Sequence, residues 1–368
     1  MNIPIIDLGK LYKEIKPEID AAVSKVIADT KFILGPEVCE IEKKIAGYCG
    51  SKYAVGCASG TDAILLSLMS LGVEPGDEII TTPFTFFATA GSISRAGAIP
   101  VFVDIEPETF NLNPELIETK ITKRTKGILP VHLFGQIVDM DPLINLKKRY
   151  NLFIVEDACQ AIGAKYKNKI AGSIGDAGCF SFFPTKNLGG FGDGGMLITD
   201  DSDVYEKAKS LRVHGSRDRY YHDYIGINSR LDTIQAAILL AEIKYLDKWT
   251  EKRRKNASLY NNLFRGIKSI QLPVEKKYLY HVYNQYTLRV KNRASLIKAL
   301  EKEEIGYGIY YPLPLHMQNC YKHLGYKKGD FPEAEKASKE VISIPVHPFL
   351  GKESINKIAD TVRNFYGV

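Results

Sequence analysis

Lys186 is the residue with the clearest chemical potential in this sequence. It follows Phe182-Phe183-Pro184-Thr185 and precedes a glycine-rich segment, residues 189–195. Apolar neighbours lower the pKa of a lysine by desolvation and so free its amine as a nucleophile. A loop lysine whose stem merely covers apolar surface fits the same stretch, so the stretch alone leaves both interpretations open.

Two further positions carry suitable chemistry, and each follows a predicted strand. Ser59-Gly60-Thr61 precedes an apolar helix, where free N–H groups bind phosphate, although an ordinary helix cap fits the same pattern. Glu156 and Asp157 end a buried strand, where unpaired acids are costly, so at least one should face a site. A lysine for a Schiff base, an acid for the pyridine nitrogen and a phosphate cradle are together what pyridoxal phosphate requires.

These groups need a sheet that brings strand ends together. Short apolar runs alternate with amphipathic segments, at 53–57, 78–81, 100–103, 128–131, 152–155, 179–182 and 196–199. The alternation predicts a mainly parallel seven-stranded sheet that is covered on both faces. Ligands of such sheets bind beyond the carboxyl ends of the strands. Two helices are predicted within residues 17–50, with a break at Gly35-Pro36.

The strand rhythm stops after residue 199. The pattern predicts helices at 204–211, 231–246, 294–302, 332–341 and 355–365, and strands at 286–290 and 308–311. Residues 212–224 show neither period and are predicted to form a polar loop that either meets an anionic substrate or is simply solvated. We expect an α/β protein with two domains, residues 1–250 for the N-terminal segment and large domain and 251–368 for a small C-terminal domain.

Composition excludes several classes of protein. The chain has 49 basic and 43 acidic residues, for a net charge of +6 without long blocks of one sign, which argues against nucleic acid as a partner. No apolar run approaches the ~18 residues of a membrane span, and the start lacks a signal-peptide pattern, so we expect a cytoplasmic protein without a membrane partner. The six cysteines lack C-x-x-C spacing, which favours reduced thiols and no metal site.

Along its whole length the sequence resembles the DegT/DnrJ/StrS family of pyridoxal-phosphate sugar aminotransferases. The matching motifs are ASGTDA (58–63), PFTF (83–86), PVHLFG (130–135), EDACQA (156–161), SFFPTKNL (181–188), GINSRLD (226–232) and YPLPLH (311–316). The resemblance implies the type I (aspartate aminotransferase) fold of pyridoxal-phosphate-dependent transferases. That fold has a large domain with a mainly parallel seven-stranded sheet and a smaller C-terminal α/β domain.

The resemblance also implies roles for individual residues. Lys186 would be the catalytic Schiff-base lysine, Asp157 the partner of the pyridine nitrogen, and Gln160 a neighbour of the ring hydroxyl. Phe86 would stack on the ring, although without the motif it reads more naturally as core, as does His132. The remaining cofactor contacts would be Gly60, Thr61 and Ser181, with Asn228 supplied by the other subunit, so that the active sites exist only in a homodimer.

The substrate implied is a nucleotide-linked keto-sugar, with L-glutamate as amino donor. The closest resemblance is to enzymes that aminate C3 of UDP-linked 2-acetamido-3-keto hexuronic acids for surface polysaccharides. In these, Arg230 could pair with the sugar carboxylate. The other substrate contacts would be His214, Tyr310, Tyr311 and His316. A dTDP-3-keto-6-deoxyhexose and a 4-keto-sugar are the alternatives, because Tyr310-Tyr311 stands where many uronate enzymes have His-Tyr.

A non-enzymatic alternative is a catalytically silent regulatory protein on the same fold. Relatives that dehydrate sugars carry histidine at the lysine position, and this chain carries Lys186 there. A DNA-binding regulator would need a basic recognition helix, and none is evident. Uptake of the cofactor therefore separates the two interpretations.

Overall fold

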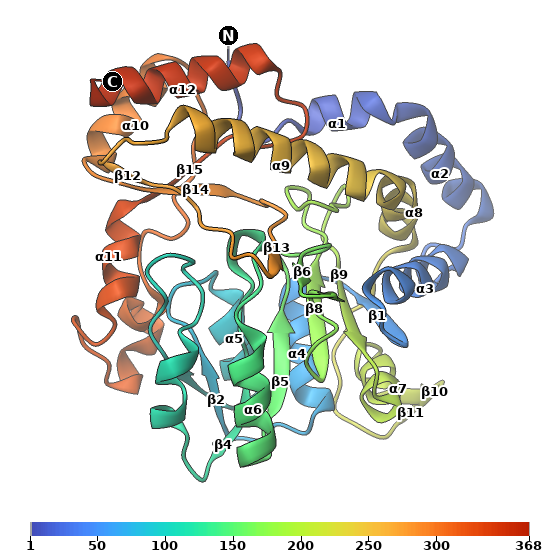
Figure 1. Cartoon of the computed structure of the whole chain (residues 1–368). Helices are drawn as coiled ribbons and strands as arrows, with labels where there is room; N and C mark the ends of the chain where they lie inside the picture. Colours follow the sequence, from blue (N-terminus) through green and yellow to red (C-terminus); the bar gives the residue numbers. More distant parts are fainter. Residues whose placement is uncertain (1, 368) are drawn as a thin grey trace.

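The large sheet has the seven strands that the sequence predicts. A computed structural model describes residues 2–367, and Figure 1 shows the whole chain. The strands are β1 (Tyr53–Cys57), β2 (Glu78–Thr81), β3 (Ile99–Phe102), β4 (Thr125–Ile128), β5 (Phe153–Asp157), β8 (Ala177–Ser181) and β9 (Gly195–Thr199). Their order is β1-β9-β8-β5-β4-β2-β3, and only β9 runs antiparallel to its neighbours. The predicted mainly parallel α/β fold is confirmed.

Helices cover both faces of this sheet, because successive strand residues point to opposite sides. In β5, Ile154 joins one buried apolar cluster and Val155 the other. The first cluster includes residues of α3 (Pro36–Cys49), α6 (Met140–Tyr150) and α8 (Thr233–Glu242); the second includes residues of α4 (Gly60–Ser70), α5 (Ala88–Arg95) and α7 (Ser202–Leu211). In Figure 1, α6 lies in front of the strands and α4 behind them.

The C-terminal part forms a separate buried apolar cluster around a three-stranded sheet. Its strands are β12 (Ile270–Gln271), β14 (Tyr286–Val290) and β15 (Val341–Ile344), and its helices are α9 (Leu246–Leu263), α10 (Arg293–Lys302), α11 (Pro332–Glu340) and α12 (Lys352–Tyr366). Figure 1 shows α9 and α12 above this sheet and α11 below it. Ile3 packs into the same cluster. The boundary predicted at residues 250 and 251 lies inside α9, and the division into two domains stays a prediction.

The remaining elements connect these parts. They are α1 (Leu8–Glu14), α2 (Lys16–Asp29), β6 (Lys165–Tyr166), β7 (Lys169–Ile170), β10 (Ser216–Asp218), β11 (Tyr221–His222), β13 (Leu279–Tyr280) and the 3₁₀ turns η1 (Pro114–Leu116), η2 (Glu118–Lys120), η3 (Leu133–Gly135), η4 (Ile243–Tyr245), η5 (Leu315–Met317) and η6 (Asn319–Leu324). Residues 17–50 form two helices as predicted, separated at Gly35-Pro36.

Two local predictions are wrong. Residues 308–311 form no strand; only Gly308 bridges to Ser343, and the prolines that follow at 312 and 314 cannot donate to a ladder. The helix predicted at 332–341 is present as α11, which ends one residue earlier, and Val341 begins β15. The loop 212–224 contains the short hairpin β10–β11.

All six cysteines are free, and four are at least partly buried while Cys39 and Cys320 are exposed. Among residues 2–367, no helix combines the length and the apolar character that crossing a membrane requires.

Candidate active site

A cavity of about 500 Å³ lies at the carboxyl edge of the large sheet. Strands β1, β5 and β8 run in the same direction, so the segments that follow them meet at this edge. The predicted residues that line the cavity are Gly60, Thr61, Phe86, Asp157, Gln160, Ser181, Lys186, Tyr310 and Tyr311. Four distant stretches of the N-terminal part and one of the C-terminal part therefore line a single cavity.

Lys186 reaches the cavity from the turn after β8. Its backbone N–H donates to the carbonyl of Phe183 at 2.9 Å, while its amine has no hydrogen-bond partner among residues 2–367. Burial lowers the pKa of the Lys186 amine, and nearby Cys159 and Asp157 partly oppose that shift. A lysine with a lowered pKa is more often neutral at physiological pH, which is the form that acts as nucleophile or base.

Asp157 is a buried carboxylate that forms no salt bridge with any of residues 2–367. Its side chain is 5% exposed; Oδ2 accepts a hydrogen bond from the Thr89 hydroxyl at 2.7 Å, and Oδ1 accepts one from the Cys159 N–H at 3.2 Å. A buried carboxylate is costly unless cations or donors compensate it. Because Asp157 lines the cavity, a cationic ring nitrogen placed there would supply the missing compensation.

The start of α4 forms a close-fitting cradle. Ser59 caps the helix through its hydroxyl, which accepts the N–H of Asp62 at 3.1 Å, and Gly60 and Thr61 line the cavity. A Cβ on Gly60 would lie 2.7 Å from Cβ of Ser181 and 2.8 Å from Sγ of Cys159, so only glycine fits. The first turn of a helix presents free N–H groups and a positive dipole end, which suit a phosphate.

Phe86 and Phe84 have different roles although they lie two residues apart. Phe84 is fully buried, whereas Phe86 is 57% exposed and lines the cavity, with its ring centroid 6.2 Å from that of Tyr311. The core interpretation is therefore wrong for Phe86. Its exposed ring is available to cover a flat ligand.

Glu156, the neighbour of Asp157, is structural. Its carboxylate is fully buried, contacts Nε2 of His132 at 2.8 Å, and accepts three backbone N–H groups at 2.6–2.9 Å. His132 is also fully buried, and its Nδ1 accepts the N–H of Val138 at 3.3 Å. The expectation that His132 is a satisfied core histidine is confirmed, and of the two acids only Asp157 faces the cavity.

The C-terminal part closes the cavity with two tyrosines. Gln160 accepts the N–H of Phe134 at 2.7 Å and donates to the Tyr311 hydroxyl at 3.1 Å, so Tyr311 is anchored across the cavity. Burial raises the pKa of Tyr311, which keeps its hydroxyl protonated and able to donate. Tyr310 lines the same wall.

Four predicted residues lie outside the cavity of this chain. Asn228 and His214 are exposed, and Arg230 is partly exposed. His316 is buried against Phe331 and its Nε2 contacts Glu335 at 3.2 Å. Their roles toward a substrate stay predictions. The only cationic residue in the described lining is Lys186.

The sequence analysis gave no role to several residues that line the cavity: Thr85, Cys159, Phe183, Asp193 and Gln285. Thr89, behind the wall, was also missed although it contacts Asp157. The spacing of Thr85 and Thr89, four residues apart at a helix start, is a signal that could have indicated two hydroxyls on one face.

The loop that carries Lys186 rests on α8. The Gln235 side chain accepts the N–H of Phe191 at 2.7 Å, and Glu242 accepts that of Gly189 at 3.4 Å. The second oxygen of Glu242 has no partner. Burial raises the pKa of Glu242 to about 8, so this carboxyl is largely protonated at neutral pH.

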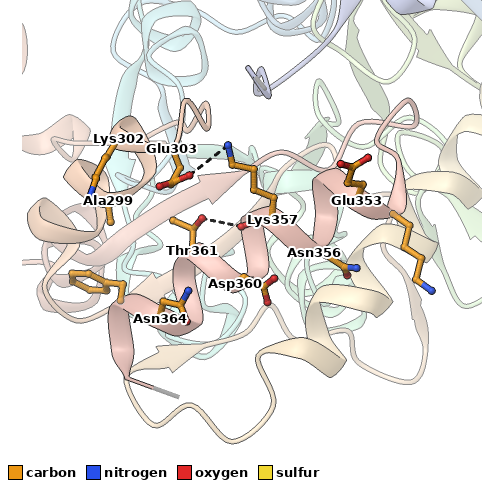
Figure 2. A pocket seen from close by; sticks show the side chains of 11 residues that line it. Ala299, Lys302, Glu303, Glu353, Asn356, Lys357, Asp360, Thr361 and Asn364 are labelled. Atoms are coloured by element: carbon orange, nitrogen blue, oxygen red, sulfur yellow. Dashed lines mark hydrogen bonds and ion pairs between the residues drawn. The ribbon is translucent and has the colours of Figure 1, made fainter.

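A wider surface hollow of about 860 Å³ lies between α10 and α12. Figure 2 shows its polar and charged side chains, with an ion pair between Lys357 and Glu303 at 3.5 Å. No residue of the Lys186 site lines it, and nothing in its wall resembles a nucleophile beside a buried acid. It is a solvated groove of the small sheet's helical cover.

Comparisons with known proteins give a consistent result. The family description "DegT/DnrJ/EryC1/StrS aminotransferase family" matches residues 13–363. A protein of Geobacillus stearothermophilus named pleiotropic regulatory protein is 50% identical over 100% of this chain and 99% of its own. The UDP-2-acetamido-2-deoxy-3-oxo-D-glucuronate aminotransferase of Pseudomonas aeruginosa is 41% identical over 98% of this chain and 100% of its own.

Solved structures agree. DesV from S. venezuelae, determined with a ketimine intermediate, superposes with a TM-score of 0.98 at 39% identity, over 100% of this chain and 99% of that one. A Bacillus subtilis protein determined with bound cofactor PMP superposes with a TM-score of 0.92 at 31% identity, over 100% of this chain and 86% of that one.

The buried Glu242 predicts a specific pH dependence of stability. Its folded pKa of about 8 lies above the ordinary 4.5, so the unfolded chain releases this proton at lower pH than the folded chain. The contribution of protonated Glu242 to the free energy of unfolding is complete below about pH 4.5. It is lost as the pH rises toward 8, at about 1.4 kcal/mol for each pH unit between the two pKa values. Glu242→Gln has no such ionisation. The unfolding free energy of the variant minus that of the native protein should therefore increase by a few kcal/mol between about pH 5 and pH 8.

Urea denaturation of both proteins at several pH values between about 5 and 8 measures this difference. Glu206→Gln, on an exposed side chain beside Lys209, is the matched control and should run parallel to the native protein. A constant difference between Glu242→Gln and the native protein across that range would contradict the prediction.

Proposed function

The chain belongs to the DegT/DnrJ/EryC1/StrS aminotransferase family, and on that premise we propose that it moves an amino group from L-glutamate to a nucleotide-linked keto-sugar. The protein is a pyridoxal-phosphate-dependent sugar aminotransferase. The observation that carries the residue assignments is the placement of Lys186, Asp157 and the α4 cradle around one cavity.

The residues of the cavity suit the cofactor. Lys186 would hold its aldehyde carbon, Asp157 its ring nitrogen, and Gly60, Thr61 and Ser181 its phosphate. Bound pyridoxal phosphate supplies an electron-withdrawing ring that acidifies the C–H bond beside an attached amine. Two observations support this arrangement: the Asp157 carboxylate lines the cavity and forms no ion pair among residues 2–367, and only glycine fits at position 60.

Each side chain then has a defined task. The free Lys186 amine would accept the α-proton of the donor and would deliver it to the former aldehyde carbon of the cofactor, and burial lowers the pKa of this amine, which favours its basic form. Asp157 would hold the ring nitrogen in its protonated form through its negative charge. Phe86 would cover a flat ligand, and Gln160 holds Tyr311, whose ring lies 6.2 Å from that of Phe86.

For the acceptor we propose C3 of a UDP-linked 2-acetamido-3-keto hexuronic acid, for surface polysaccharide synthesis. The 41% identity to the P. aeruginosa aminotransferase supports this choice. Arg230 has no ion pair among residues 2–367, so its guanidinium is available for a sugar carboxylate. A dTDP-3-keto-6-deoxyhexose and a 4-keto-sugar remain the alternatives.

We also propose a homodimer with shared active sites. Asn228 is exposed in the single chain, and its neighbour Ser229 is fixed to the cradle helix by a bond to Asp62 at 2.8 Å. Large apolar side chains that are exposed in one chain include Phe32, Ile33 and Leu34. A partner that covers these side chains and receives Asn228 would explain both observations.

Lys186→Ala should eliminate the visible absorption of lysine-bound cofactor and reduce turnover at least about 10³-fold, because it removes both the attachment point and the base. Absorption spectra with and without glutamate measure the first effect. The surface variant Lys167→Ala should behave as the native protein. Retention of both signals in Lys186→Ala would sink the assignment, and a colourless native protein would favour the silent regulatory alternative.

The acceptor is tested by assaying the protein with glutamate and each candidate sugar. We expect the UDP-uronate to be used best, and Arg230→Gln to lower kcat/KM for it about 10- to 100-fold, the loss typical of a hydrogen bond to a charged group. The dTDP sugar, which has no carboxylate on its sugar ring, should be unaffected by that change, and Arg265→Gln, at an exposed helix end, is the control. Failure of both 3-keto-sugars would point to a 4-keto acceptor.

The shared site is tested by complementation between two impaired variants. Lys186→Ala and Asn228→Asp should each be inactive or weak alone, since the added charge of the second repels phosphate. In mixed dimers one site combines Lys186 from one chain with Asn228 from the other, so random pairing should restore about a quarter of native activity. If Asn228 serves its own chain, co-expression restores nothing.

A further inference from the structure

A chain of two hydroxyl groups ends on the carboxylate of Asp157. Oγ1 of Thr85 lies 3.1 Å from Oγ1 of Thr89, and the Thr89 hydroxyl donates to Oδ2 of Asp157 at 2.7 Å. The exposed fractions are 2% for Thr85 and 0% for Thr89, so no bulk solvent competes for these bonds. Thr85 lines the cavity, whereas Thr89 lies behind the wall.

The direction of this chain follows from proton counting. An ionised carboxylate only accepts hydrogen bonds, and a hydroxyl carries one proton. The Thr89 hydroxyl donates its single proton to Asp157, so the hydrogen bond between the two threonines must be donated by Thr85. The order Thr85 to Thr89 to Asp157 is therefore fixed, and each bond polarises the next toward the carboxylate.

The Thr89 hydroxyl donates to Oδ2 of Asp157, and the Cys159 side chain also interacts with this carboxylate. The other oxygen accepts the backbone N–H of Cys159, so both oxygens are held and the carboxylate cannot rotate freely. The Thr89 bond, unlike the backbone bond, can be removed by substitution without disturbing the main chain.

One short segment positions both the Phe86 ring and the Thr89 hydroxyl. The N–H of Thr89 donates to the carbonyl of Phe86 at 3.3 Å, at the first turn of α5. Phe86 points into the cavity while Thr89 turns toward Asp157 beneath it. A shift of this turn would displace both groups together.

We propose that Thr89, oriented by Thr85, is a positioning residue that holds the Asp157 carboxylate at a fixed rotation toward the cofactor's ring nitrogen. The proposal rests on the proposed function, because it takes Asp157 as the partner of that nitrogen. Thr89 contacts neither substrate nor cofactor and acts through Asp157 alone.

Thr89→Val keeps the shape of the side chain and removes its donor. We expect pyridoxal phosphate to bind about 10- to 100-fold more weakly, as for the loss of a hydrogen bond to a charged group, and the visible absorption maximum of the bound cofactor to move. The kcat of the glutamate half-reaction should fall by a similar factor while KM for glutamate changes less than about twofold, because ground-state binding of glutamate is untouched.

Two variants distinguish positioning from mere stability. Thr89→Ser keeps the hydroxyl and should restore affinity, spectrum and kcat to within about threefold of native. Thr85→Val leaves the Thr89 donor in place but removes the group that orients it, so its effects should have the same sign and be smaller. Thr85→Val also tests the Thr85–Thr89–Asp157 hydrogen bonds independently if Thr89→Val does not fold.

The outcomes separate this proposal from the function on which it rests. Native affinity and spectrum in Thr89→Val, or a loss that Thr89→Ser does not rescue, overturns the role of Thr89 while the native enzyme still binds cofactor and turns over. In a Thr89→Val protein that does not fold, an unchanged Thr85→Val overturns it. A native protein that takes up no pyridoxal phosphate overturns both the role and the proposed function.

Discussion

The withdrawal of one acid and one lysine from water into the same cavity is the constraint on which the rest of the structure depends. Asp157 ends β5, and Lys186 follows the adjacent parallel strand β8, so the sheet itself brings them to one edge. Neither forms a salt bridge within residues 2–367. Burial lowers the pKa of Lys186 and so favours its uncharged form, and the Asp157 carboxylate accepts two hydrogen bonds and lines the cavity, where a cationic ring suits it.

Adjacent acids on one strand show how the fold separates structure from chemistry. Glu156 and Asp157 point to opposite faces because strand side chains alternate. Glu156 is enclosed by His132 and three backbone N–H groups, which makes it a fixed internal support. Asp157 receives only two donors and keeps its exposed edge toward the cavity. The number of donors, rather than the residue type, distinguishes the two roles.

The cavity is assembled from parts that are far apart in the chain, and the proposed dimer would add residues from a second subunit. Tyr310 and Tyr311 close it from the C-terminal part, and Gln160 ties that part to the large sheet. The absence of any described lining cation except Lys186 leaves an anionic substrate without a binding partner in this chain. A neighbouring subunit that brings Asn228 and Arg230 would resolve that imbalance, which is why dimerisation belongs to the proposed mechanism.

The sequence by itself determined the sheet and the central trio of groups. Apolar runs of strand length between helices, and motifs around Lys186, Asp157 and Gly60, depend on local pattern, which a single sequence displays. Tertiary structure alone decided the rest. The exposure of Phe86, the burial of His316, the loss of the strand at 308–311 and the support from Thr89 and Glu242 depend on which distant segments pack together. Burial and hydrogen-bond partners are set by those contacts, so no local pattern could fix them.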